Sequence, residues 1–363
     1  MKQTALNSVH SQAAAKMTEF QGWQLPAHFS DPTDEYHAVR GASGLFDVGF
    51  LGRIEVTGAG SEALLQSIFT RNISKMSEGT ALYGLLCNES GFILDTVLVF
   101  KLTPEGLGKR FLITTNAVST DMVLAWLKKN APGNAVISDL TATVSQFALQ
   151  GPHAESVLEA LSGAHFKKIK QKHLKTITLV DVPVMVTRTS FTGERGYELF
   201  VPADKAVVLW DALLKAGTSS GLLPCGMTSR DILRLEAGYV QYGIDIDETR
   251  TPVESGLMHV VDLHTSFLGK DAIMKRTGEP IPSKLVGFEL YDKGIPKLGG
   301  TIFSENREIG STTSGNHSPH IRKDIGLGYV LTRYAQPGQE IEIEVKDKEI
   351  AAKIIELPFY KRK

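Results

Sequence analysis

The sequence predicts an α+β protein of two or three domains that ends in a separate all-β module. The chain has 363 residues, which is more than one ordinary hydrophobic core organises. Helix and strand patterns are mixed up to about residue 280. Beyond that point, apolar and polar residues alternate with period two in short runs separated by Gly and Pro, a pattern typical of antiparallel strands. Residues 275–284 are the predicted linker between the two regions.

The first predicted helix spans residues 31–41. Asp31 suits the N-cap because its carboxylate can accept a backbone N–H of the first turn. Pro32 fits the first turn, where its missing N–H costs nothing, and Gly41 is typical of a helix end. Helical patterns also cover 60–72, 119–133 with Ser119 as the predicted cap, and 204–217.

The remaining secondary structure before about residue 220 is one amphipathic helix and a set of strands. In 204–217 the spacing places Val207, Trp210 and Leu214 on one face, and Gly217 ends the pattern. We therefore expect that face to pack against the rest of the protein. The predicted strands span 53–58, 92–102, 110–115, 176–190 and 197–201.

The composition argues against several classes of protein. With a formal net charge of −1, the chain is not expected to be a general nucleic-acid binder. Cys87 and Cys225 are two isolated thiols, which build neither a disulfide framework nor a Cys-based zinc site and favour a reducing compartment. Residues 1–16 lack the apolar core of a secretory signal, and no apolar run is long enough to span a membrane. We therefore expect a cytoplasmic protein without a membrane partner.

The common motifs of nucleotide and metal sites do not occur in the sequence. It has no GxGxxG after a strand, no GxxxxGK[ST] loop, no HExxH and no GxSxG. Residues 193–196, GERG, are too short to hold a phosphate and are predicted as a turn. His317 and His320 have a spacing found in some metal sites, but we expect them in a solvated Ser/Pro-rich loop without acidic partners. No metal site is predicted.

One stretch, 229–256, combines charged residues with apolar neighbours. Arg230 and Arg234 are separated by one helical turn, and Asp231 and Glu236 share the helical spacing. Charges interleaved with core residues are usually paired or bound to a polar ligand. A loop-like run with Asp245, Asp247 and Glu248 follows and ends at Pro252.

A set of motifs runs through the whole chain in a fixed order. The most specific is RDILRLEAGYVQYGIDIDE at 230–248. The others are MTEFQGWQLPAHF (17–29), EYHAVRGASGLFDV (35–48), ALYGLLCNESG (81–91), ALQGP (148–152), FTGERGYEL (191–199), FLGKDA (267–272), TTSGNHSP (312–319) and LPFY (357–360). In this order they resemble the aminomethyltransferase family, the T-protein of the glycine cleavage system.

The resemblance implies a fold and a reaction. The family fold is a three-domain ring, or cloverleaf, in which a folate-binding body would cover 1–275 with subdomain boundaries near residues 50 and 140. A C-terminal β-barrel would cover 284–363, in agreement with the alternating pattern there. The family moves a methylene group to tetrahydrofolate from the aminomethyl group on the lipoyl arm of a carrier protein, the H-protein, and releases ammonia. Tetrahydrofolate and this carrier are therefore the expected ligand and partner.

The resemblance also suggests which residues bind the folate. Glu198 matches the acid that binds the amino and N–H edge of the pterin ring, which suits a carboxylate because it accepts two hydrogen bonds. Arg230 matches an arginine near the folate, where a fixed cation can meet the acidic tail or orient an acid. Tyr83 and Asn116 match further pocket positions, although a core position is an equal alternative for Tyr83. The other candidate binding residues are Leu51, Phe100 and Phe191, the last two in place of a family Tyr.

The main departure from the family lies at Thr96. The family has Gly-Gly, two apolar residues and Asp-Asp where this chain has GFILDT at 91–96, so Asp95 remains and Thr96 replaces the aspartate credited with the chemistry. Side chains alternate along a strand, so Asp95 points away from Thr96. Asp95 is the second catalytic candidate, and a structural role, in which it bonds a neighbouring backbone on the back of the strand, is the favoured alternative. The loss of a charge-assisted hydrogen bond costs about 1.5–3 kcal/mol, or about ten- to a hundredfold in rate. A slower transferase is the resulting prediction.

Two other functions remain open at this point. Further polar losses, from His to Phe50 and from Tyr to Phe100 and Phe191, leave a drier pocket that suits a tetrahydrofolate-dependent demethylase or methyltransferase with another donor. The third possibility is a non-catalytic folate-binding protein. Relatives of that kind carry a K-G-C-[YF]-x-G-Q-E signature, which this chain lacks, since Cys225 lies in LLPCGMT.

Overall fold

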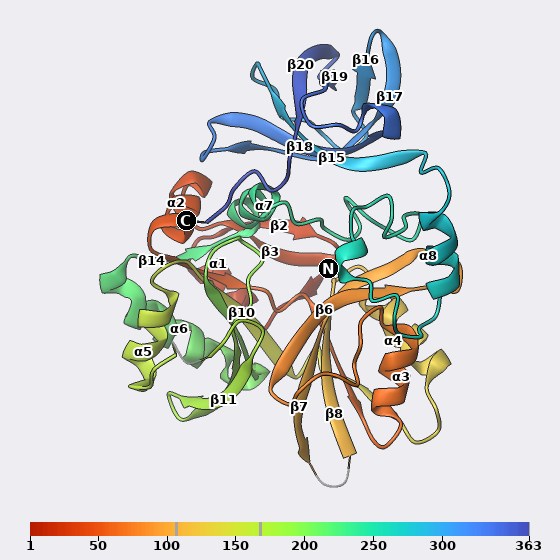
Figure 1. Cartoon of the computed structure of the whole chain (residues 1–363). Helices are drawn as coiled ribbons and strands as arrows, with labels where there is room; N and C mark the ends of the chain where they lie inside the picture. The colour runs from red at the N-terminus through yellow and green to blue at the C-terminus, as the bar shows by residue number, and fades with distance from the viewer. Residues whose placement is uncertain (106–107, 167–168, 363) are drawn as a thin grey trace. The chain divides into compact units, whose positions relative to one another are not determined.

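The computed structural model describes residues 1–105, 108–166 and 169–362. This part of the chain divides into two compact units. The first consists of Met1–Ile68, Asn72–Gly84 and Thr96–Arg230, and the second of Phe69–Arg71, Leu85–Asp95 and Asp231–Lys363. The first unit combines helices with three sheets, and the second contains a closed barrel (Figure 1), so the predicted α+β class is confirmed.

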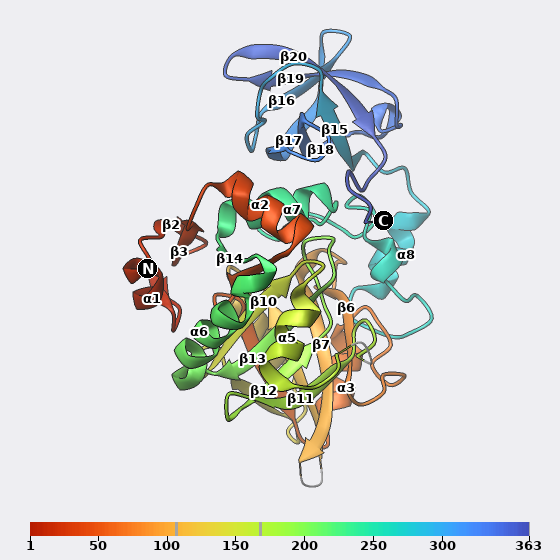
Figure 2. The same cartoon turned by 90° about the vertical axis from the view of Figure 1, so that its left-hand side faces the viewer.

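The largest sheet of the first unit has six strands. They are β4 (Ser43–Asp47), β10 (Val144–Gln150), β11 (Leu174–Leu179), β12 (Val182–Thr187), β13 (Gly196–Pro202) and β14 (Leu222–Cys225), in the order β11-β12-β13-β10-β4-β14. Two helices, α5 (Ala154–Ser162) and α6 (Ala206–Gly217), lie on the same face of this sheet (Figure 2). Trp210 of α6 packs against Phe147 of β10, with ring centroids 5.5 Å apart. That face is therefore the main core of the unit.

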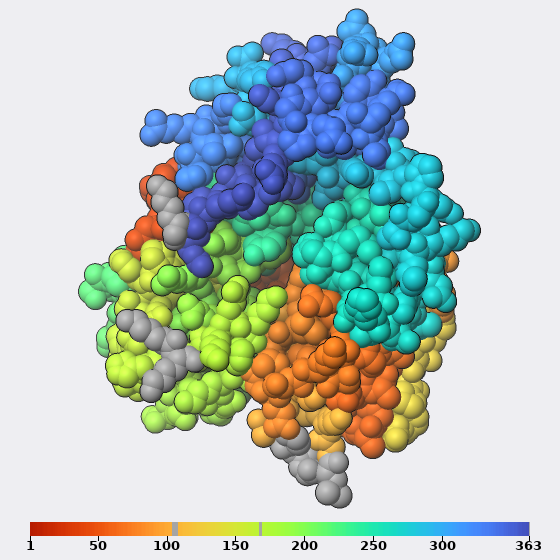
Figure 3. All heavy atoms as spheres, viewed as in Figure 1, coloured from red at the N-terminus to blue at the C-terminus, as the bar shows by residue number. Residues whose placement is uncertain are grey.

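A second sheet, of five strands, packs against the face of the six-stranded sheet that α5 and α6 do not cover. Its strands are β5 (Gly52–Thr57), β6 (Thr80–Cys87), β7 (Ile93–Glu105), β8 (Gly108–Thr115) and β9 (Val136–Asp139), in the order β6-β7-β8-β5-β9, and its helices are α3 (Ser61–Ile68) and α4 (Thr120–Asn130). A small apolar cluster of Ala81, Phe100, Leu112 and Phe200 joins the two sheets. In the space-filling view, orange residues of the five-stranded sheet abut yellow-green residues of the six-stranded sheet (Figure 3).

The N-terminal segment adds a small sheet and two helices to the first unit. The sheet has the order β1-β3-β2, formed by β1 (Lys2–Gln3), β2 (Lys16–Phe20) and β3 (Trp23–His28), and the helices are α1 (Asn7–Gln12) and α2 (Pro32–Gly41). The N-cap prediction for α2 is confirmed, because the Asp31 carboxylate accepts a hydrogen bond from the backbone N–H of Thr33 at 2.7 Å. Two 3₁₀ turns, η1 (Ala203–Lys205) and η2 (Thr218–Ser220), flank α6.

The second unit contains the predicted all-β module as a six-stranded barrel. Its strands close in the order β15-β18-β17-β16-β19-β20 around an apolar interior that includes Phe288, Ile302 and Ile343. They are β15 (Ser283–Leu290), β16 (Thr301–Ser304), β17 (Arg307–Ser318), β18 (Lys323–Leu331), β19 (Glu340–Val345) and β20 (Lys348–Ile355), with the 3₁₀ turn η4 (Thr332–Tyr334). Before the barrel come α7 (Met227–Glu236), η3 (Met258–Val260) and α8 (Lys270–Thr277); the residues of α7 up to Arg230 belong to the first unit.

The prediction of a single strand over 176–190 is wrong. The chain folds back after Leu179, so β11 and β12 form an antiparallel hairpin. Val180 and Asp181 make the turn with φ of 45° and 62°. Two consecutive residues with positive φ are typical of the tight hairpin turn whose twist matches that of the strands. The apolar residues on both sides conceal the turn in the sequence because neither turn residue is Gly or Asn.

Two helix details also differ from expectation. In α6 the buried residues include Ala206, Leu209, Trp210 and Leu213, whereas Val207 is 38% exposed. Two apolar stripes share Trp210, and the sheet covers the stripe with Leu209 and Leu213 rather than the predicted stripe with Val207. In α4, Ser119 is the N-cap residue, but its hydroxyl donates to the backbone oxygen of Asn116 at 3.0 Å instead of capping the helix, within the residues the structure describes.

Across the described ranges, no helix combines the length and the apolar character needed to cross a membrane.

Candidate functional site

The face of the six-stranded sheet turned away from α5 and α6 carries several predicted site residues. Ala148 pairs directly with Glu198, and Gln146 pairs with Phe200. Because side chains alternate along strands and directly paired residues share a face, these four side chains lie on one side of the sheet. Phe200 meets Phe100 edge to face, with centroids 5.4 Å apart. The candidate site therefore lies in the first unit, where its two sheets meet.

Glu198 is held by a neighbour on the adjacent strand. Its Oε2 accepts a hydrogen bond from Nε2 of Gln146 at 2.7 Å. Burial raises the pKa of Glu198, while the Gln146 bond and the positive charge of Arg230 act in the opposite direction. The side chain is half-buried. A carboxylate in this position gains stability from any further donor that a ligand brings.

One polar atom beside this carboxylate lacks a partner. Oε1 of Gln146 is buried and makes no hydrogen bond to any residue the structure describes. Unpaired buried polar atoms are rare in folded proteins, and each calls for an explanation.

Arg230 lies between aromatic rings. Its guanidinium carbon is 4.5 Å from the ring centroid of Phe191 and 5.7 Å from that of Phe50, and the residue is 8% exposed. Phe50 in turn meets Phe20 edge to face. Flat aromatic faces attract a guanidinium and limit its movement. The phenylalanines that the sequence suggested only as a drier surface therefore also hold this arginine in place.

The loop that carries Phe191 is fixed by a buried ion pair. Nη1 of Arg40 donates to Glu194 at 2.9 Å and to the backbone oxygen of Thr192 at 2.8 Å. The hydroxyl of Thr192 donates to Oε1 of Gln150 at 3.1 Å. The aromatic contact to Arg230 thus rests on a rigid loop.

The turn that carries Phe50 and Leu51 is likewise fixed. Asp47 accepts hydrogen bonds from the backbone N–H of Gly49 and from Nε2 of His10, both at 2.9 Å. Arg53 donates to the backbone oxygens of Gly49 and Leu51. Burial lowers the pKa of Arg53 to about 10, although Asp47 opposes this shift. Arg53 therefore remains a cation at neutral pH.

Thr96 and Asn116 are brought together by the edge-to-edge pairing of β7 and β8. Nδ2 of Asn116 donates to the Thr96 hydroxyl oxygen at 3.1 Å and to the Thr96 backbone oxygen at 3.2 Å. Thr96 shares a face of β7 with Leu98 and Phe100. Phe100 contacts Phe200, which is two residues from Glu198 on β13. Thr96 on β7, and Asn116 directly after β8, therefore lie on the face of the five-stranded sheet that packs against the sheet of Glu198.

Asp95 precedes Thr96 on β7. It is fully buried and belongs to the second unit, whereas Thr96 belongs to the first. Burial raises the pKa of Tyr242, a residue of the same unit, and the charge of Asp95 raises it further. Tyr83 is half-buried on β6, two residues after Ala81, and so faces the same side as that member of the inter-sheet cluster.

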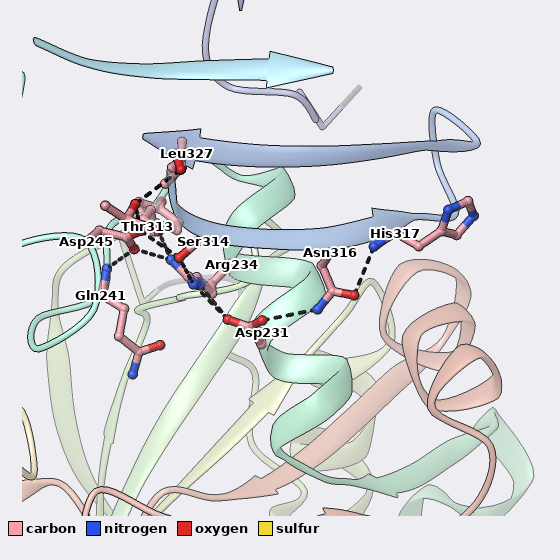
Figure 4. A network of polar contacts seen from close by, with 10 residues as sticks. Asp231, Arg234, Gln241, Asp245, Thr313, Ser314, Asn316, His317 and Leu327 are labelled. Atoms are coloured by element: carbon pink, nitrogen blue, oxygen red, sulfur yellow. Dashed lines mark hydrogen bonds and ion pairs between the residues drawn. The ribbon is translucent and has the colours of Figure 1, made fainter. Parts of the chain in front are cut away.

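The acidic residues after α7 are already engaged. Asp245 accepts hydrogen bonds from Arg234, from Thr313 and Ser314 at 2.6 Å each, and from the backbone N–H of Gln241 at 2.9 Å (Figure 4). Asp247 accepts from the backbone N–H of Thr249 at 2.8 Å. Both carboxylates therefore have roles in local structure.

The expectation for His317 is wrong. The residue lies at the end of β17 rather than in a loop, and its Nδ1 is 2.7 Å from a carboxylate oxygen of Asp324 on β18. The two side chains come together because His317 and Asp324 are direct partners in the β17–β18 ladder. Throughout the described chain, no group of three or more His, Cys, Asp or Glu side chains is arranged to hold a metal ion.

Both cysteines are buried, which predicts unreactive thiols. Burial raises the pKa of Cys87 to about 12 and that of Cys225 well above its ordinary value. Because the thiolate is the reactive form, we expect fewer than one thiol per native chain to react with an aqueous aromatic disulfide at pH 8. Two should react in denaturant. Rapid labelling of either thiol in the native protein would contradict the structure.

Gln146 and Phe50 are the site residues that the sequence did not reveal as such. Gln146 lies within VSQFAL at 144–149, where a single amide among apolar neighbours is the only available signal. Phe50 was noted as a loss of polarity, but its contact with Arg230 depends on a helix far away in the chain.

Known proteins resemble this chain over its whole length. A family model described as the GCVT N-terminal domain matches residues 6–265, and one described as the glycine cleavage T-protein C-terminal barrel domain matches 284–361. An aminomethyltransferase of Halothermothrix orenii is 39% identical over 99% of this chain and 100% of its own. One of Geobacillus kaustophilus is 37% identical over 100% of this chain and 99% of its own.

A solved structure agrees with these matches. The crystal structure of glycine cleavage system aminomethyltransferase T from Bartonella henselae superimposes with a TM-score of 0.91 at 28% identity, covering 99% of this chain and 98% of that one. The sequence motifs, the barrel and the agreement over the full length lead to one conclusion: the chain belongs to the aminomethyltransferase family of glycine cleavage T-proteins.

Proposed function

We propose that this protein is a tetrahydrofolate-dependent aminomethyltransferase of the glycine cleavage system, with a neutral hydroxyl at the position of the family's catalytic carboxylate. The observation that carries the proposal is the half-buried Glu198, bonded to Gln146 and beside Arg230. Its chemistry suits the N–H edge of a pterin ring. The same residues suit a folate better than a general anion, because an anion would be repelled by the carboxylate.

The residues of the chain divide the work of binding as follows. Glu198 accepts hydrogen bonds from the ring N–H groups, a bidentate role that a carboxylate fills well. Arg230, held against Phe191 and Phe50, supplies a fixed cation for the acidic tail of the folate or for orienting Glu198. Leu51 supplies apolar surface, and the fully buried Phe100 supports the site from behind by packing against Phe200.

The reaction transfers the methylene group in two substitution steps. One amine nitrogen of tetrahydrofolate displaces ammonia from the methylene carbon of the aminomethyl group on the lipoyl sulfur. A second folate nitrogen then displaces the sulfur from the same carbon, so that the methylene bridges two nitrogens. The two N–H protons that the folate loses go to ammonia and to the thiol. A carboxylate near the amine would stabilise positive charge that develops during these steps. Thr96, bonded to Asn116, has no such charge to offer. The proposed enzyme therefore relies mainly on holding its reactants in position.

A lipoyl carrier protein is the proposed partner. The relatives' activity as glycine cleavage aminomethyltransferases supports this, since the aminomethyl group reaches such enzymes on a lipoyl arm. We also propose the division of the chain into a folate-binding body over 1–275 and a barrel over 284–363.

The direct test is a transfer assay. The purified protein is incubated with tetrahydrofolate and aminomethylated lipoyl carrier protein, and methylenetetrahydrofolate and ammonia are measured against a reaction without enzyme. Equal amounts of both products, formed well above the spontaneous rate, are expected. Tight folate binding without either product would refute the proposed activity, and a screen of methyl donors would then test the demethylase alternative.

Replacing Thr96 by Asp is expected to raise the transfer rate by about ten- to a hundredfold, the value of one charge-assisted hydrogen bond in the transition state. Nδ2 of Asn116 is already 3.1 Å from the Thr96 side-chain oxygen and can donate to the new carboxylate. Thr96→Asn is the matched control, because it has the same size as Asp without the charge. The steady-state transfer rates of the native chain and of the Asp and Asn variants are compared. Equal rates for the Asp and Asn variants would show that charge at this position is irrelevant.

A further inference from the structure

Gln146 has an environment that stability alone does not explain. The side chain is 0% exposed and lies on β10, diagonal to Glu198 on β13. Its Nε2 donates to Glu198, but its Oε1 finds no partner in the described residues. An unpaired buried oxygen is costly, and an apolar side chain of the same size would avoid the cost. What the amide provides in return is its hydrogen bond to the carboxylate.

Few other groups around Glu198 favour its ionised form, so the Gln146 bond has a large effect on its pKa. Ala148, directly opposite Glu198, has no polar group to offer. Arg230 is the charged group that lowers the pKa of Glu198, and two neutral groups, Gln146 on β10 and Thr189 after β12, lower it through hydrogen bonds. Burial alone therefore favours the protonated carboxyl. Gln146, Arg230 and Thr189 act against it, with Gln146 the largest of the three.

We propose that Gln146 is a positioning residue for the folate, which holds the Glu198 carboxylate ionised and turned so that both oxygens can meet the N–H edge of the pterin. The proposal rests on the proposed function for its ligand, but the effect on Glu198 does not require any ligand. Because the side chain of Gln146 is fully buried, it does not contact the ligand itself and affects binding only through its hydrogen bond to Glu198.

The first experiment measures Glu198 without folate. Carboxyl ¹³C chemical shifts are recorded over a pH series in glutamate-labelled protein, with the Glu198→Gln variant used for assignment. In Gln146→Met the loss of the donor is expected to raise the pKa of Glu198 relative to the native chain. Gln66→Met is the matched control. Gln66, on α3, is another glutamine with one unpaired buried side-chain atom, its Nε2, but its Oε1 accepts a hydrogen bond from the backbone N–H of Ile73.

The second experiment measures binding of tetrahydrofolate over the same pH range. Ionised Glu198 is the form that accepts the ring hydrogens, so affinity is present above its pKa and is lost as the pH falls through it. In Gln146→Met this loss should begin at higher pH, and the Kd at pH 7 should rise about tenfold. Gln146→Glu should act in the same direction and more strongly, because two adjacent carboxylates oppose each other's ionisation.

The outcomes separate this inference from the proposed function. If both Gln146 variants fold as judged by circular dichroism and leave the titration of Glu198 unchanged, the positioning role is wrong even if folate binds. If the titration shifts but the native chain does not bind tetrahydrofolate, the proposed function fails while the effect of Gln146 on Glu198 stands. A folate Kd that changes equally at all pH values, without a titration shift, would also contradict the inference.

Discussion

Replacing Asp245 by Ala is expected to destabilise the second unit by about 3–5 kcal/mol, the cost of removing one partner from a buried ion pair. Asp245 and Arg234 are 0% and 1% exposed, and Asp245 also accepts hydrogen bonds from Thr313 and Ser314 of β17 (Figure 4). Without the carboxylate, the Arg234 cation keeps a single acidic partner, Asp231. Hydrogen exchange of the β17 amides, together with denaturant unfolding, measures the loss.

A nearby acid provides the control for Asp245. Asp247 lies two residues further along and accepts hydrogen bonds from the exposed Thr249, so Asp247→Asn should cost less than about 1 kcal/mol. The double variant Arg234→Met with Asp245→Leu should recover part of the loss, because replacing both partners of a buried pair by apolar residues is often nearly neutral. If Asp245→Ala is no worse than Asp247→Asn, the ion pair does not stabilise the unit.

Replacing Glu198 by Leu is expected to weaken tetrahydrofolate binding by about a hundredfold or more, since two charge-assisted hydrogen bonds to the pterin edge would be lost. The fold should tolerate the change, because burial of the carboxylate is itself unfavourable. Equilibrium binding measured by calorimetry or by fluorescence gives the Kd. Circular dichroism of the free protein checks the fold.

Glu155→Leu is the matched control for Glu198. Glu155 lies on α5, and its carboxylate contacts the hydroxyl of Tyr197 on the opposite face of β13 from Glu198. A change there should leave the Kd within about twofold. An unchanged Kd in Glu198→Leu, or an equal loss in both variants, would exclude Glu198 as the residue that recognises the pterin.

Local signals in the sequence predicted the elements that depend on local physics. The Asp31 cap of α2 follows from the residues within that helix, and the barrel follows from period-two alternation. The turn at Val180 and Asp181 could not be predicted in this way, because the β-branched Val180 strongly disfavours the positive φ that it adopts there. The buried face of α6 was also undetermined, since the choice between two overlapping apolar stripes is made by the sheet on which the helix packs.

The candidate site shows the same division. Glu198 and Arg230 could be named from motifs, and Thr96 from a departure within one. Their partners could not, because Gln146 reaches Glu198 from a strand 52 positions away in the chain. The contact of Phe50 with Arg230 likewise joins distant segments. A sequence identifies the residues that family members share, whereas the groups that orient them depend on strand pairing.

The pairing of Thr96 with Asn116 has a practical consequence for kinetics. Neither a hydroxyl nor an amide gains or loses a proton between about pH 5 and 9. The native chain therefore has no titrating group at position 96 and can serve as the reference for a variant that has one. Subtracting its pH–rate profile from that of the Thr96→Asp variant isolates the titration of a single carboxylate at the proposed reaction centre, without the background of other acids that complicates such measurements in enzymes.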